Sequence, residues 1–150
     1  MAEIIYQLEG LEKLDKELKY LQTHAVKVGV LGNGSANGIS VQDYAIFNEY
    51  GTSRMPARPF FRLSVGTANA QNEIKEYMKQ QVEQIIQGGM SAQQAYENLG
   101  TFVVQKIKKT IASGNFAALN PQTVKKKGHS KPLMDTHSLY ESINFEIVGA

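Results

Sequence analysis

The spacing of apolar and polar residues changes along the chain, and each change predicts a different element. Residues 3–8 are β-branched and aromatic and are followed by Glu9-Gly10, a pattern typical of a short strand and a break. Beyond the break, leucines recur at spacings of three and four with charged residues between them, which predicts an amphipathic helix. These leucines are Leu11, Leu14, Leu18 and Leu21.

Two more segments have the alternation of a half-buried strand. Residues 26–31 alternate apolar residues with Lys27 and Gly29, and residues 144–148 alternate apolar with polar side chains. A glycine-rich stretch, 32–38, follows the first of them. Its spacing, G-x-G-x-x-x-G, differs from the dinucleotide-binding fingerprint, and it lacks a phosphate-loop lysine. It therefore predicts a flexible turn or hairpin tip.

Apolar residues at helical spacing predict further helices in the rest of the chain. Two of these helices are long, and Gly88-Gly89 joins them in a short turn, so they should lie antiparallel. Gly51 ends a shorter helix that precedes them. The bounds that the pattern gives are 41–50, 63–87, 92–111 and 138–143, and the candidate N-caps are Ser40, Ser91 and either Asp135 or Thr136.

These elements predict an α+β fold. A small antiparallel sheet of 3–8, 26–31 and 144–148 should pack against the two long antiparallel helices, with an N-terminal helix and long flexible loops. At 150 residues the chain fits a single domain, 1–150. Without cysteine it has no disulfide framework and no thiol nucleophile. No apolar run approaches the ~20 residues of a membrane span, so we expect a soluble product with no membrane partner.

The corner segment, residues 48–62, separates two helical patterns and has an unusual composition. Its two prolines fix their own φ and push the preceding residues toward extended backbone, so the helix before it cannot continue. Two adjacent phenylalanines can dock the segment on a core, and three arginines are available for anions or a partner's carboxylates. Taken alone, this chemistry favours a rigid connector with solvated arginines. The interface candidates are Arg54, Pro56, Arg58, Pro59, Phe60, Phe61 and Arg62.

No pattern of catalytic or metal-binding residues stands out. The three histidines are isolated, with no H-x-x-x-H pair and no carboxylate at helical spacing to complete a metal site. Asp135, His137 and Ser138 are the residue types of a hydrolase triad, but neighbours in sequence point in different directions, and helix capping accounts for them. Asp43 and Glu49 are interpreted as ordinary helix residues. We therefore expect no enzyme activity and no cofactor.

Residues 112–133 lack periodicity and contain clustered lysines, which predicts a long, mobile, basic loop. Clustered lysines bind nucleic acid through counterion release, but only Phe116 and Tyr140 flank the cluster to stack on bases, and the net charge is only +2. A nucleic-acid-binding accessory protein is the alternative function. The candidate residues for contact with DNA, or for assembly, are Lys125, Lys126, Lys127 and Lys131.

Several short motifs occur in a fixed order along the chain. They are V-K-V-G-V-L, the glycine-rich loop, N-E-Y-G-T, P-A-R-P-F-F-R and, after the helical region, L-N-x-x-T-V-x-x-K-G with P-L-M-D-T-x-x-L-x-x-S-I. In this order they resemble the tail-completion and head-to-tail joining proteins of long-tailed bacteriophages, small neck or minor tail components also found in prophages. The family motif commonly reads D-T-G-x-L, and here His137 replaces the glycine, so a different local turn is expected.

The resemblance, which spans most of the chain, implies a non-enzymatic structural subunit of the virion. Such a protein would be made in the host cytoplasm and would assemble as a homo-oligomer, a six-fold ring, at the neck or the head-proximal end of the tail. Its partners would be the head-tail connector and the tail tube or tail terminator proteins, with non-specific contact to DNA that passes through the ring. A ring subunit needs rigid projections and contacts that close by rotation.

Overall fold

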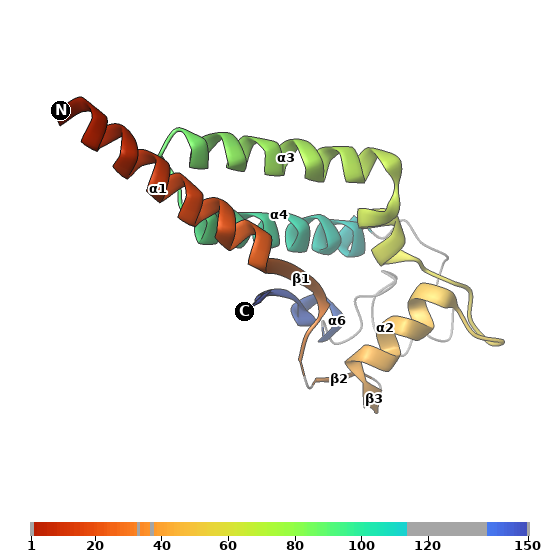
Figure 1. The fold of residues 1–150 in the computed structure, drawn as a ribbon. Helices are drawn as coiled ribbons and strands as arrows, with labels where there is room; N and C mark the ends of the chain where they lie inside the picture. The colour runs from red at the N-terminus through yellow and green to blue at the C-terminus, as the bar shows by residue number, and fades with distance from the viewer. Residues whose placement is uncertain (1, 33, 37, 114–137, 150) are drawn as a thin grey trace.

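The computed structural model describes residues 2–32, 34–36, 38–113 and 138–149, and it has the predicted α+β fold. Three long helices dominate it: α1 (Ala2–Thr23), α3 (Ala68–Ile86) and α4 (Ala92–Ser113). In Figure 1, α3 and α4 run side by side, and α1 crosses them obliquely with its N-terminal end projecting beyond them. The shorter helix α2 (Val41–Tyr50) lies at the opposite end of the molecule.

The first element corrects the prediction for the N-terminus, because residues 3–8 belong to α1 and not to a strand. The helix runs through Gly10, where the expected break does not occur. A glycine inside a helix costs only about 1 kcal/mol relative to alanine. A continuous helix offsets that cost because each residue added to an existing helix forms one more backbone hydrogen bond, whereas a strand needs a partner strand.

The sheet therefore contains two of the three predicted strands. Strand β1 (His24–Val30) pairs antiparallel with β4 (Ile143–Gly149), in a register that runs from His24 opposite Gly149 to Val30 opposite Ile143. The amide of Leu31 donates to the carbonyl of Ser142 at 2.9 Å and extends the pairing. The glycine-rich stretch leads into two-residue strands, β2 (Ser35–Ala36) and β3 (Ile39–Ser40), which pair as the hairpin that its composition predicted.

The helical hairpin of α3 and α4 is confirmed, with one correction. Its turn uses Gly88 at φ +81°. The predicted helix 63–87 is broken at Thr67, whose extended backbone (φ −77°, ψ 152°) separates the π-helical turn η1 (Arg62–Gly66) from α3. The Thr67 hydroxyl accepts from the amide of Ala70 at 3.1 Å, so a threonine that can cap a new helix ends the old one.

Buried side chains form two clusters. The larger cluster joins α2, α4, β4 and the short helix α6 (Ser138–Ser142) around Phe60, Ile107, Ile111 and Leu139, each at most 1% exposed. The smaller cluster packs α1 onto the turn end of α3 and α4. Two hydrogen bonds fix α1 there: Glu17 accepts from the amide of Ala92 at 2.7 Å, and the Tyr96 hydroxyl donates to the Leu21 carbonyl at 2.7 Å.

The predicted basic loop falls almost wholly on 114–137, which lie outside the described residues, as do its lysines and the candidate caps Asp135 and Thr136. At its start, Ala112 and Ser113 belong to α4 rather than to a loop. Within the ranges that the structure describes, no helix is both long enough and apolar enough to cross a membrane.

Candidate interaction site

The corner segment begins where α2 ends, and Gly51 makes the turn. Gly51 has φ +76°, a value that L side chains rarely adopt, and its amide donates to the Phe47 carbonyl at 2.8 Å. A Cβ on this glycine would lie 2.8 Å from the backbone nitrogen of Ala57. Glycine is therefore required both by the backbone angle and by the close approach of the returning chain.

Beyond Gly51 the chain forms a closed, projecting tip, residues 52–57. The amide of Thr52 donates to the Met55 carbonyl at 2.9 Å, and the amide of Met55 donates back at 3.3 Å. The Thr52 hydroxyl also accepts from the amide of Arg54 at 3.2 Å. Figure 1 shows this loop extending away from the helices. Most of its residues are exposed: Thr52, Ser53, Arg54, Pro56 and Ala57.

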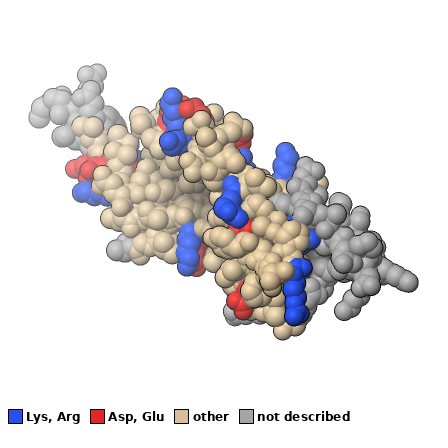
Figure 2. Space-filling view, turned by 90° about the vertical axis from the view of Figure 1, so that its right-hand side faces the viewer, with Lys and Arg blue, Asp and Glu red and all other residues tan. Residues whose placement is uncertain are grey.

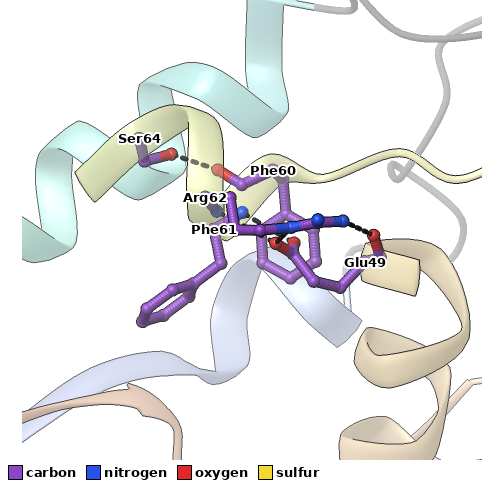
Figure 3. Close-up of polar contacts among 5 residues, drawn as sticks. All are labelled: Glu49, Phe60, Phe61, Arg62 and Ser64. Carbon is purple, nitrogen blue, oxygen red and sulfur yellow. Dashed lines mark hydrogen bonds and ion pairs between the residues drawn. The ribbon is translucent and has the colours of Figure 1, made fainter. Parts of the chain in front are cut away.

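Glu49 clamps the base of the corner (Figure 3). Its carboxylate accepts from the backbone amides of Phe61 and Arg62 at 2.9 and 3.0 Å, and from Nε of Arg62 at 2.9 Å. The Arg62 guanidinium also donates to the Glu49 carbonyl at 2.6 Å and lies over the Tyr50 ring, 5.1 Å from its centroid. The carboxylate is nearly buried, so these charge-assisted bonds hold the start of η1 against the end of α2.

From the sequence, Glu49 was interpreted as an ordinary helix residue, although one signal indicated that it needs a partner. A carboxylate in the last turn of a helix is unfavourable beside the helix dipole, so an acidic residue there needs a compensating partner. The arginine-rich stretch that follows could have supplied that partner. Which arginine would do so cannot be read from spacing, because the chain turns through the tip before Arg62 comes back to α2.

The structure corrects the expectation that all three arginines are available. Arg58 is 6% exposed, its amide donates to the Asn48 carbonyl at 2.5 Å, and its guanidinium lies 3.5 Å from the Asn48 side-chain oxygen. Desolvation by burial lowers the pKa of Arg58 from its usual value, and the neighbouring Tyr44 opposes this shift. Arg62 is engaged by Glu49, and Arg54 is exposed at the tip.

The two phenylalanines have different roles. Phe60 is 1% exposed and belongs to the main core, so it faces its own chain. Phe61 is half-buried, with its ring at 80° to that of Phe60 and 6.4 Å from it, and it lines an apolar groove of about 300 Å³ between β1, η1, α3 and α4. Pro59 is half-buried between Arg58 and Phe60. The second half of the corner therefore anchors the exposed tip.

Large apolar side chains lie exposed on the outer side of α2, beside the tip. Ile46 is 52% exposed, Phe47 41% and Tyr50 69%. Their spacing of three and four places them on one helix face, opposite the buried Tyr44 and Asn48. Phe47 is apolar, as are the buried Val41, Tyr44 and Ala45 of the same helix, but it does not share their burial. This α2 face and the tip form one continuous candidate surface for contact with a partner.

The remaining sequence candidates do not form a site among the described residues. His24 stacks on Tyr20 with ring centroids 3.8 Å apart, and its Nδ1 lies 3.0 Å from the Tyr20 carbonyl, so it joins α1 to β1. Ser138 begins α6, and the other members of the considered triad lie outside the description. No cluster of metal-ligating side chains occurs in the described ranges.

Lysines and arginines do not form one broad patch on the face shown in Figure 2. On the face shown in Figure 2, lysines and arginines are separated by wide areas of other residues and are accompanied by acidic side chains. Comparison of the chain with models of protein families, with curated proteins and with solved structures finds no match. Function is therefore inferred from the geometry of the corner and from the order of the sequence motifs.

Proposed function

We propose that the chain is a structural virion protein that completes a bacteriophage tail and joins it to the head connector, as a ring subunit that acts through protein-protein contacts. The observation that supports this most is the corner: an exposed tip that buried residues of the same chain hold rigidly. A projection fixed in advance loses little conformational entropy when it binds, as a docking element should. The order of the sequence motifs, which resembles that of bacteriophage tail-completion proteins, connects the proposal to a phage virion.

The structure changes which residues of the corner should touch the partner. Arg58 and Phe60 are buried, so substituting them tests folding rather than docking. The contact residues are then Arg54 and Pro56 of the tip together with the α2 face. Phe61 and Arg62 support the contact from behind, since Phe61 borders the apolar groove and Arg62 is bonded to Glu49.

The test is made in the phage or prophage that encodes the chain. Arg54→Glu should leave the purified protein folded but produce unjoined heads and tails in electron micrographs. The matched control is Lys79→Glu, which makes the same change of charge at an exposed position of α3, away from the corner, and should give normal particles.

Two results would reject the proposal. The first is the absence of the chain from purified intact particles, by mass spectrometry and antibody labelling at the neck. The second is normal joining in Arg54→Glu and Tyr50→Ala particles. If the purified protein instead binds duplex DNA with a salt dependence that weakens when Lys125, Lys126, Lys127 and Lys131 are neutralised, the nucleic-acid-binding function takes its place.

A further inference from the structure

One edge of β1 has no partner strand among the described residues. The sheet that β1 forms with β4 contains no other described strand, so each of the two strands has an outer edge. In an antiparallel pair, alternate residues point their backbone N–H and C=O groups away from the partner strand. The amide of Leu31 bonds to Ser142, so in the same register the backbone groups of Val26 and Val28 point away from β4.

The two outer edges of this sheet differ. On β4, the amide of Phe145 points away from β1 and donates to the side-chain oxygen of Asn144 at 2.8 Å, so a side chain covers this donor. On β1, no hydrogen bond from a described residue reaches the outward backbone groups of Val26 and Val28. An unpaired edge of this kind is a template for one more strand.

The apolar groove of about 300 Å³ runs beside the outer edge of β1. Val26 and Val28 line it from β1, the other lining residues come from the start of η1, from α3 and from α4, and all of them are apolar. Figure 3 shows the Phe61 ring, which also lines the groove, extending away from the Glu49 clamp. None of the described residues of β4 lines the groove, so it lies on the side of β1 that β4 leaves open.

The edge and the groove together select an extended polypeptide strand as their occupant. The backbone of a strand supplies alternating donors and acceptors, which complement the partial charges of the outward groups of Val26 and Val28. Apolar side chains at every second position of that strand fill the groove, because successive side chains of a strand point to opposite faces. A helix bonds its backbone groups internally, and a small apolar molecule leaves the edge unpaired.

The β1 strand of a second copy does not fit as this occupant. Two identical antiparallel edges that continue one sheet are related by a two-fold axis normal to the sheet, so the elements beneath the two β1 strands lie on the same side of it. The copies of η1 and α3 that wall the two grooves would then collide. The strand must come from a segment without helices beside it.

We propose that the outer edge of β1 binds an extended segment of a partner protein with apolar side chains at alternate positions, which adds a third strand to the sheet and fills the groove. Pairing of the two backbones supplies affinity, and the groove selects the side chains. The inference goes beyond the proposed function, because the edge and the groove contain no residue of the tip or of the α2 face.

Amide hydrogen exchange measured by NMR tests whether the edge is open. In dilute protein alone, the amides of Val26 and Val28 should exchange fast, whereas the amide of Lys27, which bonds to β4, should exchange slowly. The probe is a capped peptide of alternating threonine and valine with a lysine at each end, and it should slow exchange at Val26 and Val28 by about tenfold or more. Slow exchange without the peptide would mean that this chain or a second copy occupies the edge. That result, or no slowing at any soluble concentration of peptide, would overturn the proposal.

Two proline variants form a matched pair on the two edges of the sheet. Val26 and Ile147 lie opposite each other, and the amide of each points away from the other strand. Val26→Pro and Ile147→Pro therefore each remove one outward donor and no bond between β1 and β4, as proline at a sheet edge does. Val26→Pro should weaken peptide binding by about tenfold or more, and Ile147→Pro should leave it within about twofold. Equal effects of the two prolines would refute the proposed edge.

Modified peptides give a test on the wild-type chain that does not depend on how a variant folds. Methylating the valine amides and methylating the threonine amides remove donors from opposite edges of the peptide. Only one of these two peptides should bind about tenfold or more weakly than the parent peptide, because only one edge faces β1. Equal binding by both would mean that the groove holds side chains without an added strand. All of these experiments use free protein, so peptide binding by a chain that is absent from particles would keep this site and discard the proposed function.

Discussion

Replacing Gly100 and replacing Gly10 by alanine should change the free energy of unfolding in opposite directions. Gly100 lies within α4 directly beneath the Phe145 ring of β4. A Cβ built there would lie 2.7 Å from Cε2 of that ring and closer still to Cγ and Cδ2. Gly10 lies within α1, and a Cβ there would meet nothing within 4 Å.

The expected magnitudes follow from two opposing terms. Alanine is favoured over glycine in a helix by about 1 kcal/mol, so Gly10→Ala should raise the free energy of unfolding by roughly that amount. At Gly100 the same gain is outweighed by overpacking, which costs about 1–3 kcal/mol. Because Phe145 is held by the pairing of β4 with β1, its ring cannot move without moving the sheet, and the cost should lie at the upper end. The net loss is then about 2 kcal/mol.

Urea denaturation gives the free energy of unfolding of both variants and thermal denaturation gives their Tm, each followed by circular dichroism. For a chain of this size, 1 kcal/mol corresponds to about 2–4 °C, so Tm should fall by roughly 4–8 °C in Gly100→Ala and rise by about 2–4 °C in Gly10→Ala. Phe145→Leu should cost less in the Gly100→Ala background than in the wild type, because the smaller side chain relieves the overlap. Equal stabilisation by both alanines would refute the packing of β4 on α4.

Three further variants probe the corner by the same denaturation assay. Glu49→Gln should lower the free energy of unfolding by about 1.5–3 kcal/mol, because it removes the charge that accepts from two amides and a guanidinium. The control Glu76→Gln, at an exposed position of α3, should change the free energy of unfolding by less than about 0.5 kcal/mol. Gly51→Ala should cost roughly 2–3 kcal/mol, and more than Gly88→Ala, which has the same strained φ but no atom within 4 Å of the new Cβ. Phe60→Ala should cost about 3–5 kcal/mol and Phe47→Ala under about 1 kcal/mol; equal losses would contradict the burial of one and the exposure of the other.

Local signals in the sequence predicted most of the secondary structure. The helix 41–50 has the predicted cap at Ser40 and the predicted end at Gly51, and the glycine turn between α3 and α4 lies where the composition placed it. Such signals are readable because a cap or a glycine turn depends on residues only a few positions apart. The two strands with clear alternation were also found, since a strand buried on one face keeps a period of two whichever strand it pairs with.

The tertiary structure determined which side chains of each segment are buried and which are exposed. Residues 3–8 suit a strand by composition, but in the described part of the chain the sheet of β1 and β4 has no third strand, and residues 3–8 extend α1. Arg58 resembles Arg54 in sequence, yet one is buried against Asn48 and the other is exposed at the tip. Glu49 and the amides that it binds are separated by a reversal of the chain, and so are Gly100 and Phe145. By itself the sequence determined the local elements, because their causes lie within a few residues. Only packing between distant segments decided the Glu49 clamp, the burial of Arg58 and the exposure of the apolar α2 face.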